Sequence, residues 1–534
     1  MKRYFTTLYL LALAFIGIGY IFVLPLFEGL DETAHFSRLR EVAFTKKLNY
    51  TANIDQSVTA YKGPMPYSTG FPPYDSAFVY LKFFQDQNSI NFYEKNYRHE
   101  NFNDSFVPSN EPNWQYQHPP LYYLLTAPIV SLTQKLALLD QFLLIRIFSY
   151  LMALTGVFIS IKTLLSNHFF NLKNKQLSFM KISIVLYPLL FPEFFFEFAR
   201  IGNDSLSLLI SGLLFYAISE WYQDQLNLKK TVILGVILGL GILTKAFFIP
   251  ISFAFGIFTL VNFSHNGYFK KKLTSVIKMF FAIVFPILII GGSWYIVKFI
   301  ATGDLGGGYD TYQLNQNGGF VNGFLKNYTF KGLSHGLLMP FATFSWIGSW
   351  SVVRMPSFMY FILILIGFWI AVNSLSALKK IPLYNIHWLV IWLFLFMFMG
   401  LFWHVLIMVA LSGYGASGGH YLHILFPWII PWLSLGIMQI YKTNKQSFFM
   451  IPVIIYTVVF HLIAFWFHIS LFSGCASKGN DKHFIFNGNY YCLDQISTVI
   501  HNLAILNYSN LGIVLYIAGI ALLATLIRFE INSN

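Results

Sequence analysis

The chain has 534 residues, of which 56% are hydrophobic, 19% aromatic and only 11% charged, with a formal net charge of +13. Soluble domains carry about a quarter charged residues. Together with a mean hydropathy of +0.58, this composition excludes a soluble globular protein and predicts a polytopic membrane protein. The Lys and Arg residues lie mostly in short loops between apolar runs, which is typical of cytoplasmic loops and argues against a nucleic-acid-binding surface.

Apolar runs of about 17–25 residues define the predicted membrane spans. The first follows Met1-Lys2-Arg3. It is too long for the apolar part of a signal peptide and lacks a small-x-small cleavage site, so we expect a retained anchor with its N-terminus in the cytoplasm. Twelve spans are predicted in all, at about 5–27, 141–165, 179–197, 204–222, 230–245, 247–263, 274–300, 357–377, 386–411, 421–441, 449–472 and 511–529.

The basic residues test this arrangement, because cytoplasmic loops are enriched in Lys and Arg. They follow the even-numbered spans: Lys173, Lys175, Lys181, Lys229, Lys230, Lys270, Lys271, Lys272, Lys379, Lys380, Lys442, Lys445 and Arg528. With the N-terminus inside, all of them fall inside. Both termini are therefore predicted to be cytoplasmic.

One apolar stretch, at 119–139, does not fit as a thirteenth span. If it crossed the membrane, every later lysine cluster would lie outside. It also begins with a proline pair and is interrupted by Pro128. We therefore predict a helix that lies along or dips into the outer membrane interface.

Three segments then face outward from a single transmembrane domain, 1–534. They are 28–140, which carries the interfacial helix and is rich in Tyr, Phe, Asn and Pro, then 301–356 and 473–510. The last segment holds both cysteines of the chain, Cys475 and Cys492. They can form a disulfide if the segment is external.

Polar residues collect at the outer ends of the predicted spans. Ionisable groups at a membrane are costly and mark functional sites by default. The candidates are Asp31, Glu32 and His35 after the first span, His118 before the interfacial helix, Arg200, Asn203 and Asp204 after the third, Lys245 after the fifth, Arg354 before the eighth, and His420 with His423 near the start of the tenth.

Each candidate also has a structural explanation. The alternatives are a helix N-terminus for Asp31, a helix cap for Asn203, snorkelling to headgroups for Lys245, a surface position for His118 and an ion pair with Glu197 for Arg200. The spacing of His420 and His423 is compatible with metal binding but is a weak signal without further ligands.

Four short motifs carry a resemblance to a known family. They are D-E-x-x-H-F at 31–36, H-P-P-L-Y-Y at 118–123, G-N-D-S-L at 202–206 and L-G-I-L-T-K at 240–245. In order and topology the chain resembles the GT-C superfamily of integral-membrane glycosyltransferases, and within it a bacterial branch of predicted membrane proteins. Lipid A aminoarabinose transferase and the protein O-mannosyltransferases are more distantly similar. The resemblance implies an all-α, GT-C-like fold at the bacterial cytoplasmic (inner) membrane.

The same resemblance implies transfer of a sugar from a polyprenyl-phosphate donor to an envelope acceptor. Asp31 is then expected to be the base, and Glu32 a second carboxylate or acceptor-positioning group. Substrate binding falls to His35, His118, Arg200, Asn203, Asp204, Lys245, Arg354 and His420, of which Lys245, Arg200 and either Arg354 or His420 stabilise the leaving phosphate. Related sequences often show Q-G-R-Y where this chain has G-G-H-Y at 418–421, so His420 replaces an arginine.

Aromatic residues near His118 have two interpretations. Trp114, Tyr116, Tyr122 and Tyr123 suit a wall on which a sugar stacks, or an ordinary aromatic belt at the membrane surface. No cofactor and no metal are expected. If a divalent cation is used, its ligands would come from Asp31, Asp204 and the histidines.

The alternative to an enzyme is a transporter or flippase of a lipid-linked saccharide. Transporters place ionisable groups near the bilayer midplane, within interrupted helices. Here the predicted span interiors are almost free of charge, and the polar residues gather on one side, which favours an enzyme. A non-catalytic partner in envelope assembly, holding other proteins through 301–356 and 473–510, is a third hypothesis.

Overall fold

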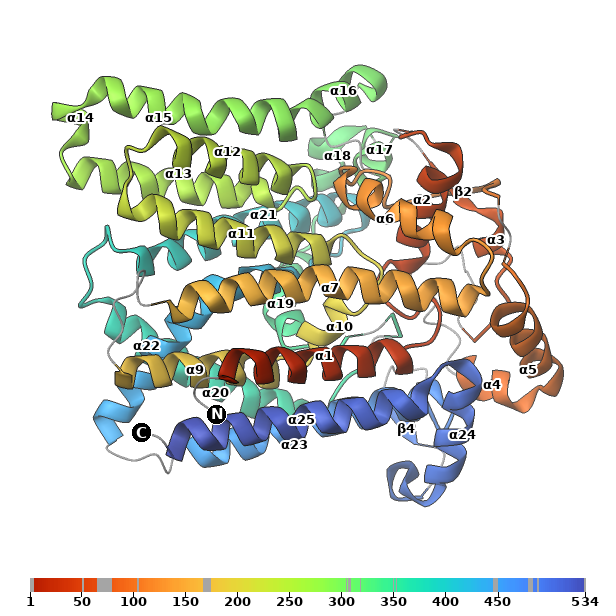
Figure 1. Ribbon diagram of the computed structural model, residues 1–534. Coiled ribbons are helices and arrows are strands. Elements are labelled where there is room, and N and C mark those ends of the chain that lie inside the picture. Colours follow the sequence, from red (N-terminus) through yellow and green to blue (C-terminus); the bar gives the residue numbers. More distant parts are fainter. Residues whose placement is uncertain are drawn as a thin grey trace.

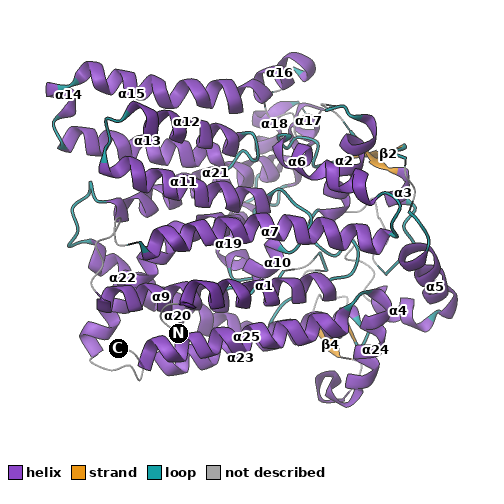
Figure 2. Cartoon of the chain, in the orientation of Figure 1, coloured by secondary structure: helices purple, strands orange, loops and turns teal. Residues whose placement is uncertain are grey.

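The computed structural model describes residues 4–49, 52–64, 79–102, 105–166, 174–303, 305, 309–316, 318–348, 350–351, 353–444, 450–478, 484–486 and 489–532. Two of the basic loop residues, Lys173 and Lys445, lie outside them. The described chain is overwhelmingly helical (Figure 2), and its strands form two two-stranded antiparallel sheets. The predicted all-α membrane architecture is confirmed.

Ten helical segments within the described residues are long and apolar enough to cross a membrane. They are α1 (Phe5–Val23), α7 (Leu138–Leu165), α11 (Asp204–Gln223), α13 (Phe248–His265), α15 (Leu273–Pro286) continued by η3 (Ile287–Gly292) and α16 (Ser293–Thr302), α20 (Ser357–Leu378), η4 (Ile386–Trp388) with α21 (Leu389–Ser412), η5 (Gly419–Leu425) with α22 (Phe426–Asn444), α23 (Met450–Phe472) and α25 (Ser509–Asn532). They run side by side as one bundle (Figure 1).

Two of the twelve predicted spans are shorter in the structure. The range 179–197 is split into α9 (Asn174–Leu190) and the short α10 (Glu193–Phe198), which begins after Pro192. The range 230–245 forms α12 (Leu228–Ile242), with 15 residues. At about 1.5 Å per residue, α9 and α12 are roughly 26 and 23 Å long. Both lie within the bundle (Figure 1), and the count of twelve spans stays a prediction.

The first and third predicted outer segments gather at one end of the bundle. Figure 1 shows α2 (Glu32–Thr45), α4 (Val79–Gln85), α5 (Gln87–Tyr93) and α24 (Ile496–Leu506) at that end, and both termini toward the other. This arrangement agrees with the sides that the basic loops predict.

The first outer segment folds against the bundle. Its further elements are α3 (Gln56–Thr59), η2 (Glu94–His99), α6 (Leu121–Thr133), and the strands β1 (Asn53–Asp55) and β2 (Pro108–Pro112), which pair antiparallel. Arg40 Nε contacts Asp55 Oδ2 at 2.7 Å, with both side chains fully buried. Because breaking a buried ion pair is costly, this contact fixes α2 to the strands.

The predicted interfacial helix is α6. It has 13 residues with Pro128 inside, so it is roughly 20 Å long, less than the ~30 Å hydrocarbon core. Its first residue donates from Leu121 N to Leu243 O over 3.2 Å, which ties it to the end of α12. Its position at a membrane interface stays a prediction.

The other two outer segments are also partly helical. The second contains α17 (Tyr309–Gln316), α18 (Gly319–Asn327) and α19 (Phe330–Phe344), and α19 packs against α21 and η5. The third contains the paired strands β3 (Ala476–Lys478) and β4 (Phe484–Phe486), then η7 (Asn489–Gln495) and α24. Cys475 and Cys492 are disulfide-bonded.

Close helix packing holds the frame on which the outer end is built. A Cβ at Gly156 of α7 would lie 2.4 Å from Leu208 O of α11, and one at Gly212 would lie 2.3 Å from Gly156 O. Small residues let membrane helices approach to backbone contact. The close approach fixes α7 against α11, and Arg200, Asn203 and Asp204 stand at the start of α11.

Candidate functional site

Asp31 stands at the junction of α1 and α2 in a strained backbone conformation. Its φ and ψ are 58° and 10°, in the left-handed region, which is uncommon for a non-glycine residue and clusters at functional sites. Its carboxylate does not cap α2. Instead, Trp114 Nε1 donates to Asp31 Oδ1 over 2.8 Å. Asp31 is the N-cap residue of α2, so its predicted position at a helix N-terminus is confirmed, but its carboxylate accepts from Trp114 and not from the helix amides.

The surroundings of Asp31 favour its protonated form more than water does. Burial raises the pKa of the carboxyl above its ordinary value, and the Trp114 hydrogen bond and the cations Arg200 and Lys245 partly oppose that rise. A partly buried carboxylate whose pKa is shifted toward neutrality is a suitable general base.

Glu32 is a structural clamp. Arg146 donates from Nε to Oε1 over 2.8 Å and from Nη2 to Oε2 over 2.6 Å. The backbone amides of Ile201 and Gly29 donate to the same carboxylate over 2.9 and 3.0 Å. The carboxylate is fully buried. It therefore ties the loop that holds Asp31 to α7 and to the segment before α11.

Arg200 and Lys245 meet at Asp204. Arg200 Nη2 contacts Asp204 Oδ2 at 2.9 Å, and Lys245 Nζ contacts Asp204 Oδ1 at 2.5 Å. Arg200 Nη2 also contacts Glu197 Oε1 at 2.6 Å, so the ion-pair explanation for Arg200 is confirmed. Lys245 is 5% exposed, which excludes snorkelling to the headgroups.

This network reaches the residue beside Asp31. Arg200 Nη1 donates to Leu30 O over 2.7 Å, and both Arg200 and Lys245 act electrostatically on the Asp31 carboxyl. The predicted base and the predicted phosphate-binding cations therefore lie in one cluster, although 214 positions separate Asp31 from Lys245 (245 − 31).

Asn203 has a different role from the predicted cap. Its side chain makes no capping bond at the start of α11. Asn203 Nδ2 donates instead to Thr244 O over 3.2 Å, which fixes the turn that carries Lys245. Its Oδ1 is buried and has no hydrogen-bond partner among the described residues, so it is an acceptor that a ligand hydroxyl could satisfy.

The two histidines of the first segment lie together. The rings of His35 and His118 stack with centroids 5.8 Å apart, and His35 Nδ1 is 2.8 Å from the Tyr123 hydroxyl. Desolvation, reinforced by Lys245 among other charges, lowers the pKa of His118 to about 3. Burial also holds the pKa of His35 well below its ordinary value. Both imidazoles are therefore neutral hydrogen-bonding groups at pH 7.

His420 lies at the edge of the cluster, next to Tyr421. The two rings are 4.1 Å apart, and Lys245 Nζ lies 4.4 Å from the centroid of the Tyr421 ring. His423 is turned elsewhere, with Nδ1 at 2.7 Å from the Tyr187 hydroxyl. Arg354 is exposed, and within the described part of the chain it contacts none of the other candidates.

Two further charged residues of this end were not among the predicted site residues. Arg146 binds Glu32 from 114 positions away, and no local pattern indicates that partner. Lys298, in the middle of α16, is fully buried with its ammonium 5.1 Å from the Tyr116 ring centroid. A single lysine at the end of an apolar span was the sequence signal for it.

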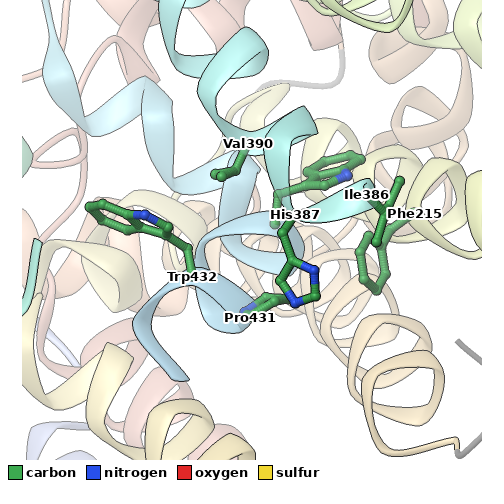
Figure 3. A pocket seen from close by; sticks show the side chains of 7 residues that line it. Phe215, Ile386, His387, Val390, Pro431 and Trp432 are labelled. Carbon is green, nitrogen blue, oxygen red and sulfur yellow. The ribbon is translucent and has the colours of Figure 1, made fainter. Parts of the chain in front are cut away.

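The described residues offer no group of three or more His, Cys, Asp or Glu side chains arranged to hold a metal ion. A small pocket lies elsewhere, between α11, the start of α21 and α22 (Figure 3). His387, Trp428 and Trp432 are among its lining residues, and its volume of about 10 Å³ suits roughly one water molecule. None of the candidate residues lines it.

Comparison with known proteins gives one family and one distant fold likeness. The model of the family described as predicted membrane protein (DUF2142) matches residues 13–422. No curated protein matches the chain. Two solved structures are similar to it. ArnT from Cupriavidus metallidurans bound to undecaprenyl phosphate has 12% identity and a TM-score of 0.45 over 97% of this chain and 77% of that one. ArnT in the apo state has 13% identity and a TM-score of 0.37 over 91% and 75%.

Proposed function

The chain belongs to the predicted membrane protein family (DUF2142), and we propose that it is a GT-C-type glycosyltransferase. It moves a sugar from a polyprenyl-phosphate donor to an envelope acceptor at the outer face of the bacterial cytoplasmic membrane, with both termini in the cytoplasm. The observation that carries the proposal is the contact network in which Arg200 and Lys245 share Asp204 and Arg200 donates to Leu30 O, beside Asp31. The motif resemblance to GT-C enzymes supports it.

Asp31 is the general base in this proposal. It accepts the proton of the acceptor hydroxyl as that oxygen attacks the anomeric carbon. Trp114 fixes one carboxylate oxygen, and the α7-anchored Glu32 clamp fixes the loop, so the base is oriented before substrate binds. General-base catalysis contributes roughly 10²–10⁴-fold.

Arg200 and Lys245 stabilise the leaving phosphate. Negative charge grows on that phosphate as the glycosidic bond breaks, and preorganised cations in a low-dielectric site stabilise it strongly. In the free protein, Asp204 holds both cations. A carboxylate between two cations occupies a position that suits a phosphate oxygen, so donor binding would replace part of these contacts.

Neutral polar groups complete the site. His35 and His118 bind sugar hydroxyls as uncharged donors or acceptors, and Asn203 Oδ1 accepts a further hydroxyl. His420 lies close enough to Tyr421 and Lys245 to line the edge of the donor site. No cofactor is part of the proposal.

The test follows the lipid product, because every sugar donor of this class releases the same one. Purified protein in proteoliposomes is given a panel of undecaprenyl-phosphate sugars and an envelope extract as acceptor. Free undecaprenyl phosphate is then measured by mass spectrometry. We expect release by the wild type and a fall of about 10²-fold or more in Asp31→Asn.

The matched control is Asp86→Asn, which makes the same change at an exposed residue of the same outer segment and should leave release unchanged. Release by Asp31→Asn at the wild-type rate would remove Asp31 from the mechanism. Movement of intact lipid-linked saccharide across the bilayer without release would instead identify a flippase.

A further inference from the structure

Helix α16 has one buried stripe, and its other faces expose apolar side chains. Of its ten residues, Trp294 and Lys298 are buried, at 6% and 0% exposure. Ile296, Phe299 and Ile300 are 54%, 49% and 77% exposed. In the span that ends with α16, only 11% of the most apolar window is buried inside the protein. A charged side chain therefore points inward from a helix whose other faces suit contact with lipid.

Lys298 lies under two aromatic rings. Its Nζ is 5.1 Å from the Tyr116 ring centroid and 5.9 Å from that of Trp294. Aromatic faces attract a cation without neutralising its charge. Tyr116 comes from the loop before α6, so this contact joins the lipid-facing helix to the first outer segment.

The charge of Lys298 also reaches the candidate site. Lys245 and Lys298 both act on His118, where each lowers the pKa of the imidazole. Lys245 approaches from the turn between α12 and α13, and Lys298 from α16. His118 is therefore influenced by two cations that belong to different elements.

We propose that Lys298, beneath Tyr116 and Trp294, binds the phosphate of the polyprenyl-linked donor at the lipid side of the site, with the polyprenyl chain lying along the apolar face of α16. This inference rests on the proposed function. A donor whose tail stays in the bilayer must bring its phosphate to Arg200 and Lys245 from a lipid-exposed edge. An inward-facing cation on a lipid-exposed helix offers that phosphate a binding partner at the edge.

The first experiment measures binding without turnover. Affinity of the detergent-solubilised full-length protein for undecaprenyl phosphate is measured for the wild type, Lys298→Gln and Lys298→Arg. We expect about tenfold weaker binding by Lys298→Gln and near-wild-type binding by Lys298→Arg. The control is Lys278→Gln, an exposed lysine of the adjoining α15, which should bind as the wild type does.

A second measurement needs no variant. A photoreactive undecaprenyl phosphate carrying a diazirine near the phosphate is crosslinked to the wild-type protein, and the labelled peptides are mapped. Label on 294–302 that excess undecaprenyl phosphate removes, but inorganic phosphate and phosphatidylglycerol do not, supports the proposal. Equal displacement by phosphatidylglycerol would mean a general lipid contact and overturn it.

The outcomes separate this inference from the function on which it rests. If the wild type binds undecaprenyl phosphate and Lys298→Gln binds it equally well, with no label on 294–302, the role of Lys298 is wrong and the glycosyltransferase proposal stands. If the wild type does not bind undecaprenyl phosphate at all, both fail.

Discussion

At the scale of single residues, the site depends on the partly buried carboxylate of Asp31 and on the nearby cations Arg200 and Lys245. Burial of Asp31 works against its charged form, and Arg200 and Lys245 work in favour of it. The balance raises the pKa of the carboxyl, so its carboxylate is a stronger base than that of an ordinary aspartate.

The first residue-scale prediction concerns pH. Because the pKa of Asp31 is raised in the folded protein, the carboxyl is still protonated at pH values where an ordinary aspartate is ionised. We expect kcat/KM for release of undecaprenyl phosphate to rise with pH through this raised pKa, so that the acidic limb lies at higher pH than an ordinary aspartate would give. The limb should be absent from the residual activity of Asp31→Asn.

The raised pKa of Asp31 changes the free energy of unfolding in the opposite direction: activity rises with pH, whereas stability falls. A carboxyl with a raised folded-state pKa contributes most stability below its unfolded pKa, and that contribution is lost as pH rises through the folded value. Asp31→Asn, which cannot ionise, should therefore be at least as stable as the wild type at pH 7. A clear drop in its Tm would mean that the ionised carboxylate supports the fold.

The second prediction concerns Lys245. Lys245→Ala removes a cation that is buried against Asp204 and should reduce kcat/KM for the lipid donor by about 10²-fold, since one well-placed electrostatic donor contributes roughly 2.7–4 kcal/mol to the transition state. The KM for the acceptor should change little. Steady-state kinetics with each substrate varied in turn measures the difference.

The control for Lys245→Ala is Lys230→Ala. Lys230 stands near the other end of α12 and also pairs with a carboxylate, that of Glu220 at 3.3 Å, but the pair is partly exposed. Its loss should leave both substrate constants unchanged. Unaltered donor constants in Lys245→Ala would contradict a phosphate-binding role.

At the scale of elements, the loop between α1 and α2 is held by partners far along the chain. Glu32→Gln breaks a fully buried pair with Arg146 and should destabilise the protein by about 3–5 kcal/mol. The exposed pair of Lys95 and Glu100, at 3.7 Å, provides the control. Glu100→Gln should change stability by less than about 1 kcal/mol.

Two measurements on Glu32→Gln distinguish two roles for Glu32. One is denaturant unfolding in detergent, and the other is the rate at which undecaprenyl phosphate is released. A structural clamp predicts lost stability, with activity lost in proportion to the unfolded fraction. Wild-type stability with abolished release would instead make Glu32 a catalytic residue, as the D-E-x-x-H-F resemblance implied.

The sequence predicted the elements better than the contacts between them. Hydrophobic run length and lysine placement were sufficient to locate α1, α7 and α11, because lipid imposes a strong and local constraint. They did not separate α10 from α9, where Pro192 begins a new short helix. Asn203 illustrates the limit for contacts: its position before α11 suggested a cap, but its amide bonds Thr244 of another turn, and local pattern carries no information on such partners.

At the scale of the whole molecule, the mechanism requires one orientation in the membrane. The first and third outer segments and the chain termini lie toward opposite ends of the bundle (Figure 1), so the two ends must face different compartments. A polyprenyl-phosphate sugar used at the outer face requires Asp31 and α5 to face outward and α14 (Tyr268–Lys271) to face the cytoplasm.

Cysteine accessibility measures this orientation. Asn88→Cys in α5 and Lys271→Cys in α14 both introduce a thiol at an exposed position, and the native cysteines are joined in a disulfide and so give little background. In intact spheroplasts we expect a membrane-impermeant maleimide to label Asn88→Cys and to label Lys271→Cys only after permeabilisation. The reverse pattern would place Asp31, Arg200 and Lys245 at the cytoplasmic face, where a donor in the outer leaflet cannot reach them. That orientation would contradict the proposed reaction.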